Sequence, residues 1–519
     1  MRTQILHIIV ALVLVLQLSC ANIQITTNRN DATRTPLACA LYAANLHDDP
    51  SEISEVAVKY AEAGDFKKAI EVAEAISEKH FIELVNQAFF FRRVKEYSVS
   101  EKIKAFSEIA IWQAKSGKTN EARITLEKAF SLSDLLKGPH DISRESQLEK
   151  IVPKFVLIGD EERAISIAES LPTEKPLESE TYFTSSKISM LVLVAENLAQ
   201  IGHKEKSVEM LGQAENLFNQ FPLVDISGTE AMKMVEIYVQ LGKQDKAFEI
   251  LSMLTEREEA SAQKKPGLKP NGLKEIAIML VKLGKLPEGV NLALSIKDPQ
   301  TQAWAIADIA SLLAKSKDYV AALTLLNKVP EGEIRFKFRA QAEIAKLLLD
   351  DGNFDKALEL TNQIESKNEK ASVLAYVAQK YSKLGNQDKA RETAIAAFEF
   401  CKDIKNDNGF IESALQYVLL VDKNVVLEMM KEEGLKADDF NWLLPTMSEK
   451  LAEANQDKLA TEILNYIQTE GQIIHGGTIT VRDYRAQAIV KIAIQYYDSK
   501  HPVDANLQAT LAEFVKLLD

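Results

Sequence analysis

Side chains that could do chemistry are scattered along this chain. The histidines do not have the spacing of metal ligands. They are His7, His47, His80, His140, His203, His475 and His501. The sequence contains no Gly-x-Ser-x-Gly, His-Glu-x-x-His or Cys-x-x-Cys motif. We therefore expect a protein that is not an enzyme, with no catalytic, cofactor-binding or metal-binding residues and no cofactor.

One tripeptide resembles the end of a phosphate-binding loop, namely Gly117-Lys118-Thr119. That loop needs a glycine five positions before Gly117, where Trp112 stands, and a strand in front of it. We therefore interpret Gly117 as a turn between helices. A hydrolase that uses a pair of surface carboxylates stays a remote alternative, because such a pair depends on a cleft that spacing does not reveal.

The first residues are typical of an export signal. Arg2 precedes the apolar run Ile5–Leu18, which is short for a membrane span and typical of a signal peptide. We predict a signal peptide over residues 1–21. Two forms remain open, because cleavage can occur before Asn22 or Cys20 can be lipidated as in a bacterial lipoprotein. The product would be periplasmic, a membrane-anchored lipoprotein, or secreted.

Composition narrows the class of partner. The chain has 519 residues and a formal net charge of −13, so its surface repels nucleic acid and anionic lipid. We expect no nucleic-acid partner, and membrane attachment only through Cys20. The absence of Asn-x-Ser/Thr favours a bacterial source. Residues 22–50 are polar at first, and we predict a tether there that ends in a short helix near Leu37–Leu46.

A short phrase then recurs from Ser51 onward. Its clearest copy is Val56-Ala57, Tyr60, Gly64 and Ala69, with spacings of about 4, 4 and 5 residues that follow one helix stripe and then cross a turn. The turn residue should be left-handed, which glycine adopts without steric cost. These predicted hinges are Gly64, Gly117, Gly159, Gly202, Gly242, Gly284, Lys317, Gly352 and Gly385, with weaker copies at Asp422–Asn424, Asn455 and Lys500.

This phrase resembles the tetratricopeptide repeat (TPR) over residues 51–519. The resemblance implies an all-α, right-handed superhelical solenoid of about 11–12 helix hairpins. Hinges from Gly284 to Gly385 are 33–35 residues apart and earlier ones lie further apart, which suggests sub-blocks 51–300 and 301–519. A related α-hairpin repeat is the alternative. We also predict an additional helix at His80–Val94, and a short hairpin or ordered loop around Gly476-Gly477.

The resemblance implies a concave groove lined by the first helix of each hairpin, which commonly holds peptides. Exposed groove positions should fall six and two residues before each hinge. These partner-binding candidates are Glu196, Gln200, Glu236, Gln240, Lys282, Lys315, Lys346, Gln379 and Lys383. We therefore predict an interaction scaffold for a protein or peptide partner. The alternative is a binder of an envelope glycan or small ligand that uses Trp112, Trp304 and Trp442.

Overall fold

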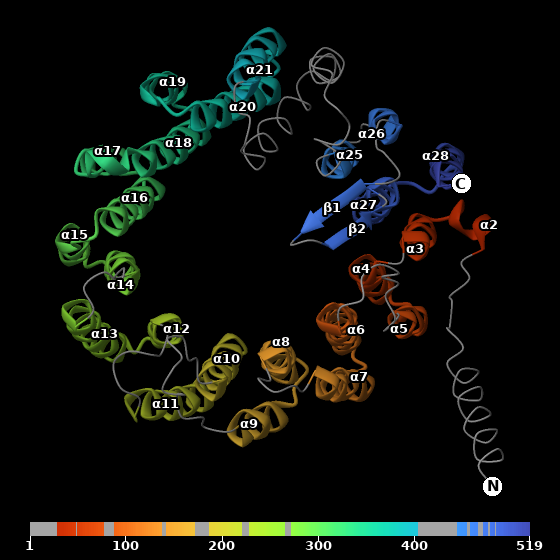
Figure 1. The fold of residues 1–519 in the computed structure, drawn as a ribbon, viewed down its shortest axis with the longest axis horizontal. Coiled ribbons are helices and arrows are strands. Elements are labelled where there is room, and N and C mark those ends of the chain that lie inside the picture. Colours follow the sequence, from red (N-terminus) through yellow and green to blue (C-terminus); the bar gives the residue numbers. More distant parts are fainter. Residues whose placement is uncertain are drawn as a thin grey trace. The chain divides into compact units, whose positions relative to one another are not determined.

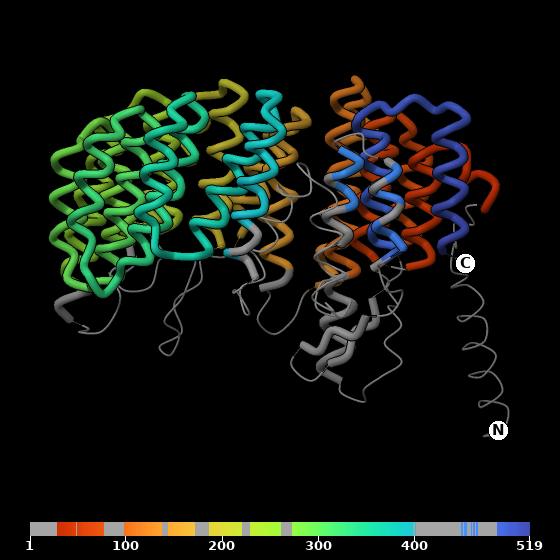
Figure 2. Tube along the Cα trace, turned by 90° about the horizontal axis from the view of Figure 1, so that it is seen from above, coloured from red at the N-terminus to blue at the C-terminus, as the bar shows by residue number. Residues whose placement is uncertain are grey.

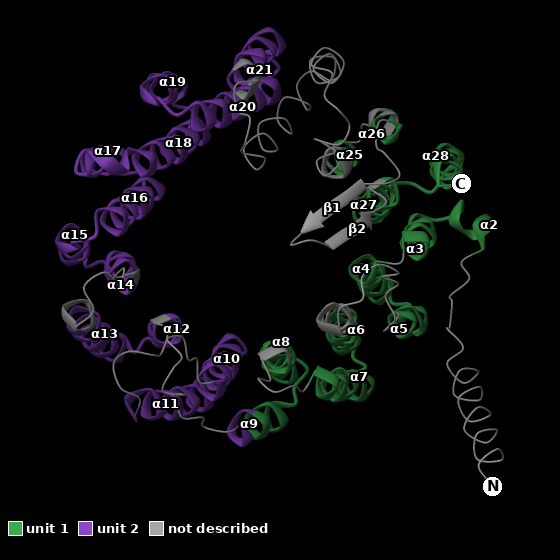
Figure 3. Ribbon diagram, in the orientation of Figure 1, with its two compact units in different colours: residues 1–167, 437–519 green, residues 168–436 purple. Residues whose placement is uncertain are grey.

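The structure is a computed structural model of the 519-residue chain. It describes residues 28–47, 49–76, 88–136, 142–171, 186–220, 228–264, 271–402, 444–453, 457–465, 471–475, 478–482 and 484–518. The predicted signal peptide, Cys20 and Trp442 lie outside these ranges. The described residues are almost entirely helical (Figure 1) and form two compact units, Met1–Ile167 with Ala437–Asp519, and Ala168–Lys436 (Figure 3).

Unit 1 combines the two ends of the chain. Its N-terminal part contains α2 (Arg29–Ala32), α3 (Pro36–His47), α4 (Pro50–Glu62), α5 (Phe66–Ala75), α6 (Ala88–Lys115), α7 (Thr119–Ser133), the 3-10 turn η1 (Asp134–Leu136), α8 (Ile142–Leu157) and most of α9 (Glu161–Ser170). Its C-terminal part contains α25 (Leu444–Glu453), α26 (Asp457–Leu464), β1 (Gly471–His475), β2 (Thr478–Arg482), α27 (Tyr484–Asp498) and α28 (Ala505–Leu517).

Unit 2 is continuous in sequence. After the end of α9 it contains α10 (Ser186–Gln200), α11 (Lys204–Gln220), α12 (Gly228–Gln240), α13 (Gln244–Lys264), α14 (Asn271–Lys282), α15 (Leu286–Ser295), α16 (Pro299–Lys315), α17 (Tyr319–Leu326), the turn η2 (Glu331–Glu333), α18 (Ile334–Asp350), α19 (Phe354–Gln363), α20 (Lys367–Lys383) and α21 (Gln387–Lys402). Figure 2 shows these helices running up and down beside one another.

The hairpin α4–α5 shows how each turn is built. Gly64 has a φ of 85° and its N–H donates to the carbonyl of Ala61 at 3.0 Å. The N–H of Asp65 donates to the carbonyl of Tyr60 at 2.9 Å, which completes a Schellman motif. The Asp65 carboxylate then accepts from the N–H of Lys68 and begins α5. One hinge thus ends the first helix and lets the second begin at once.

The predicted hinges are confirmed wherever the structure describes them. Among the described residues, positive φ occurs at eight glycines and two lysines, and all ten are predicted hinge positions. At each hinge, the N–H of the next residue donates to the carbonyl of the residue four positions before the hinge. They are Gly64, Gly117, Gly159, Gly202, Gly242, Gly284, Lys317, Gly352, Gly385 and Lys500. The predicted turns at Asp422–Asn424 and Asn455 fall outside the described ranges.

Small residues bring the two helices of each hairpin together. Ala57 and Ala69 are fully buried on facing sides of the first hairpin. At Gly289, in the position of Ala69, a Cβ would lie 2.6 Å from the carbonyl oxygen of Ala277, so only glycine allows α14 and α15 to approach this closely. The repeated phrase thus encodes the spacing between helices as well as the turn. Within each unit the described helices therefore form stacked hairpins with the TPR-like pattern that the phrase predicts.

The predicted tether is corrected for its second half. Residues 36–47 form the predicted short helix, α3, but α3 belongs to the core, with Cys39 and Leu41 fully buried. It packs between α4 on one side and α27 and α28 on the other, as Figure 1 shows. A helix that is apolar around its circumference is an interior helix, and the segment from Pro36 onward has that composition.

Three other expectations can be compared with the structure. Residues 88–94 are the start of the 28-residue helix α6, so the predicted additional helix is not separate there, because no glycine or proline interrupts the segment. The expected hairpin is confirmed as β1 and β2, which pair antiparallel with Ile473 opposite Thr480. The two units divide the chain at other positions than the sub-blocks 51–300 and 301–519, which remain a prediction about repeat length.

Candidate binding face of unit 2

The nine candidate residues all lie on first helices of unit 2, namely α10, α12, α14, α16, α18 and α20. Exposed members are Gln200, Glu236, Gln240, Lys282, Lys315 and Lys383. Glu196, Lys346 and Gln379 are half-buried. Because the hinge register is confirmed, each residue occupies the expected helix stripe. We call this stripe, taken over the six helices, the first-helix face.

The structure brings two of the candidates together across neighbouring hairpins. The ammonium of Lys282 on α14 lies 3.8 Å from a carboxylate oxygen of Glu236 on α12. Both side chains are about half exposed, so this pair contributes little to stability. The contact shows that residues at positions −6 and −2 of consecutive repeats can meet on one face.

Lys346 has a different environment from the other candidates. Its ammonium donates to the hydroxyl of Ser372 on α20 at 2.7 Å. Burial lowers the pKa of Lys346, while Glu369 and Glu343 act against that shift. Lys346 therefore joins α18 to α20, and we interpret it as a packing residue more than as a cation offered to a partner.

Sequence reasoning missed a row of acidic residues on the same helices. Glu275, Asp308 and Glu343 stand nine residues before their hinges on α14, α16 and α18. Burial raises the pKa of Asp308, and Arg339 of the next first helix lies 4.0 Å from it. Extending the hinge register by one further turn would have found this row. The first-helix face thus has carboxylates in one row and lysines in another.

Asp350 interrupts the lysine row, and the structure shows how it is compensated. The hydroxyl of Tyr376 donates to its carboxylate at 2.5 Å, and the Lys380 ammonium lies 2.6 Å away. Although desolvation acts in the opposite direction, these hydrogen bonds from α20 lower the pKa of Asp350. The Asp350 carboxylate is therefore paired with Tyr376 and Lys380 of the same unit, and the lysines of the row, such as Lys315 and Lys383, remain cationic.

The aromatic candidates are engaged in contacts within the protein. The ring of Trp304 stacks with Phe336 at 6.1 Å between centroids, and the buried Lys274 ammonium lies 3.5 Å from its centroid. Lys115 lies 4.4 Å from the Trp112 ring. Trp442 lies outside the described residues. The Trp304 contacts stabilise the interfaces of α16 with α14 and α18, whereas the Lys115–Trp112 contact lies within α6.

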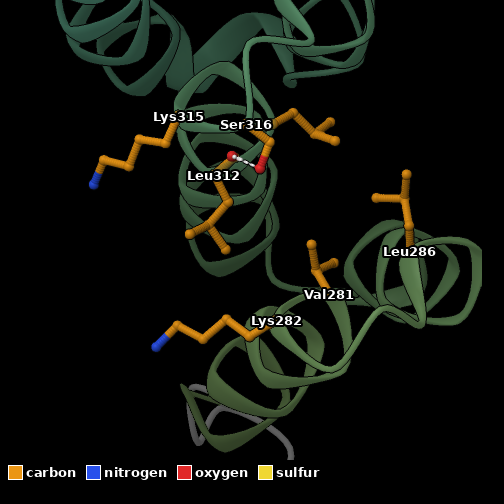
Figure 4. A pocket seen from close by; sticks show the side chains of 7 residues that line it. Val281, Lys282, Leu286, Leu312, Lys315 and Ser316 are labelled. Atoms are coloured by element: carbon orange, nitrogen blue, oxygen red, sulfur yellow. Dashed lines mark hydrogen bonds between the residues drawn. The ribbon is translucent and has the colours of Figure 1, made fainter.

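A cleft opens beside the lysine row where α14, α15 and α16 meet. Its volume is about 360 Å³, and its lining residues are Val281, Lys282, Leu286, Leu312, Leu313, Lys315 and Ser316. The Ser316 hydroxyl donates to the Leu312 carbonyl at 3.2 Å (Figure 4). Because the cleft lies between two consecutive hinges, Gly284 and Lys317, we call it the hinge cleft.

Two further observations limit the chemistry of the described part of the chain. Within it, we find no group of three or more His, Cys, Asp or Glu side chains placed to hold a metal ion. No described helix combines the length and apolar composition needed to cross a membrane. The thiol of Cys39 is fully buried, and burial raises its pKa to about 12, so it is a packing group in α3.

The comparisons with known proteins find similar solved structures but no family. No family model matches the sequence, and no curated protein matches it. One similar solved structure is a putative kinesin light chain with TPR-like repeats from Podosopora anserina, which is 17% identical. The match covers 42% of this chain and 98% of that chain, with a TM-score of 0.22. Yeast Tom70 is 15% identical, with 83% and 86% coverage and a TM-score of 0.26. Naa15/Naa10 bound to HypK-THB is 15% identical, with 86% and 74% coverage and a TM-score of 0.29.

Proposed function

We propose that the chain is a non-catalytic interaction scaffold that holds an extended segment of a protein partner along the first-helix face of unit 2. The observation that carries this proposal is the alignment of exposed polar residues on consecutive first helices. The Glu236–Lys282 contact shows that neighbouring repeats present these residues together. An extended segment can contact several repeats at once, and rows of opposite charge would fix its direction.

Photo-crosslinking in the native cell tests this proposal. A photoreactive residue is placed on the first-helix face at Gln240, Lys315 or Lys383, and on second helices at Glu205 or Lys356, which are also exposed. We expect the face positions to capture a protein that the second-helix positions do not capture, identified by mass spectrometry. Equal capture from both sets would contradict a binding role for the face.

Charge reversal then measures the contribution of the lysine row. Lys383→Glu should weaken binding of the captured partner, because an exposed attractive charge becomes repulsive. Lys356→Glu on α19 is the matched control and should have no effect. Lys346→Glu is a poor test, because Lys346 bonds to Ser372 and its reversal would also disturb the packing of α18 on α20. Unchanged binding to Lys383→Glu would remove this end of the face from the proposed site.

We further propose that the scaffold works outside the cytoplasm, held there by lipid on Cys20. The apolar run Ile5–Leu18 followed by Ser19-Cys20 supports this proposal. Intact-mass analysis of the mature chain from a bacterial membrane fraction should find acylated Cys20 at the N-terminus. Cys20→Ala should release the protein from that fraction. A mature chain that begins at Asn22 would support secretion instead, and a retained leader would contradict export.

A further inference from the structure

The hinge cleft combines apolar walls with a cationic rim. Val281, Leu286, Leu312 and Leu313 are all half-buried, so their side chains remain accessible to a ligand. A volume of about 360 Å³ lies at the lower end of the ~300–1,000 Å³ range of small-ligand pockets. This is room for one large apolar side chain and little more. The Ser316 hydroxyl is already bonded to the Leu312 carbonyl, which leaves the lysines as the polar groups at the rim.

The two rim lysines point the same way. Figure 4 shows Lys282 of α14 and Lys315 of α16 extending from their helices toward one side of the cleft. Lys282 has only the long 3.8 Å contact with Glu236, and Lys315 has no ion pair or hydrogen bond to any described residue. Two ammonium groups on one side of the cleft with so little compensation favour acidic groups of a ligand there.

The acidic row restricts which anion fits. Glu275 and Asp308 stand on the same two helices, seven residues before Lys282 and Lys315. At 1.5 Å per residue this places carboxylates roughly 10 Å along the helix axes from the lysines. Glu275 lies 2.8 Å from the Lys274 ammonium and Asp308 lies 4.0 Å from Arg339, so the acidic row offers no attraction to a polyanion long enough to reach both rows. A compact acidic group confined to the cleft would meet the lysines alone.

We propose that the hinge cleft is an anchoring site for a peptide in which a large apolar residue is flanked by acidic residues. The apolar side chain enters the cleft between Val281, Leu286 and Leu312, and the flanking carboxylates bind Lys282 and Lys315. This inference rests on the proposed function, since it names one anchor point for the extended segment. It also specifies the composition of the bound segment, which the first-helix face alone does not determine.

A peptide array probed with the full-length protein tests this proposal. The array carries nonamers with one central Leu or Phe flanked by zero to three Glu, with matched peptides in which Glu becomes Lys or the central residue becomes Ser. We expect retention of the acidic-apolar peptides, with loss on either replacement. The best peptide is then labelled with fluorescein, and its Kd is measured by fluorescence anisotropy.

The variant Lys282→Glu/Lys315→Glu should raise the Kd of that peptide by at least about tenfold, the size of effect expected when two attractive charges are reversed. Lys356→Glu should leave its Kd unchanged. Equal retention of acidic and basic peptides, or an unchanged Kd in the double variant, would overturn the proposal. Photo-crosslinking of the wild-type protein from Gln240 and Lys383 separates the two hypotheses. If the peptide tests fail while these positions still capture a partner, the first-helix face stands without the hinge cleft. If these positions also capture no partner, both hypotheses are wrong.

Discussion

The two units build the same kind of stack from very different parts of the chain. In unit 2 each first helix contacts the first helices of the adjacent hairpins, as α14, α16 and α18 do in series. In unit 1, α3 packs against α27 and α28, and the Lys59 ammonium lies 2.6 Å from a carboxylate oxygen of Asp498, 439 positions away. A repeat needs a neighbour in space, and that neighbour need not be adjacent in sequence.

This difference has consequences for stability. The first helix of an open repeat array has one uncovered face and is usually polar there. Here α3 is buried on several sides, including at Leu37, Ala40 and Leu41, so it is an interior helix between the N-terminal and C-terminal repeats. Unit 1 therefore depends on contacts of long sequence separation, whereas unit 2 depends on local ones. We expect damage to spread differently in each.

The largest expected effect comes from emptying the packing around α3. Leu41→Ala should destabilise unit 1 by about 2–5 kcal/mol, because Leu41 is fully buried and its cavity cannot be solvated. Hydrogen exchange read by mass spectrometry should then show lost protection in residues 36–47 and also in residues 484–517.

The matched control is Leu198→Ala on α10, which is equally buried in unit 2. Its loss of protection should stay within α10, α11 and α12, because these are sequence neighbours in contact. If Leu41→Ala leaves residues 484–517 fully protected, the pairing of the chain ends does not contribute to the stability of unit 1.

A smaller effect is expected at the two lysine hinges, of which each unit has one. Lys317 in unit 2 and Lys500 in unit 1 have φ of 68° and 53°, a conformation that costs a residue with a Cβ about 1–2 kcal/mol. Lys317→Gly and Lys500→Gly should each stabilise their own unit by about 1 kcal/mol in chemical denaturation. Lys317→Gly gains slightly less, because it loses an exposed pair with Asp351.

The reverse substitution serves as the control for the hinges. Gly352→Ala should cost about 1 kcal/mol through backbone strain alone, since nothing lies within 4 Å of the position that its Cβ would occupy. Destabilisation by both lysine-to-glycine variants would show that the lysine side chains contribute more than their backbone conformation costs.

The smallest effect concerns a buried carboxyl of unit 1. Burial raises the pKa of Glu52 above its ordinary value of 4.5, with Asp49 and Glu55 adding to the rise and the hydrogen bond with His47 opposing it. The folded state therefore binds the proton more tightly than the unfolded state does. This carboxyl lowers the stability of unit 1 as the pH rises from 4.5 through the folded pKa.

Glu52→Gln should accordingly stabilise unit 1 at pH 7, and the gain should narrow as the pH falls toward 4.5. Glutamine keeps an acceptor for His47 and removes the buried charge. Denaturation of both proteins across this pH range measures the difference directly. A gain of equal size at pH 4.5 and pH 7 would mean that the carboxylate charge is not its cause.

Sequence predicted the local features of the fold because local chemistry specifies them. A hinge such as Gly64 needs a left-handed residue and a partner carbonyl four residues earlier, and both are visible in a short window. The positions of Lys282 and Lys315 on the first-helix face follow from the same register. The acidic row at Glu275 and Asp308 also follows from it, once the register is extended by a turn.

Features that depend on distant packing could not be predicted in this way. The contact of α3 with α27 has no signal in the spacing of either segment, since both simply read as apolar helices. The hinge cleft depends on where Leu286 of a second helix lies beside Leu312 of the next hairpin. The bond from Lys346 to Ser372 is likewise set by the packing of α18 on α20, so an expected groove cation proved to be half-buried.

Because α3 packs in unit 1 and α2 packs against α28, the segment between Cys20 and the folded part of unit 1 is short. If lipid is attached at Cys20, that anchor lies only eight positions before Asn28, the cap of α2. Eight extended residues reach at most about 28 Å, so unit 1 would be confined to the membrane surface, where a tether of 29 residues would allow it to range widely. The C-terminal helices α27 and α28, which pack against α3, would share that confinement.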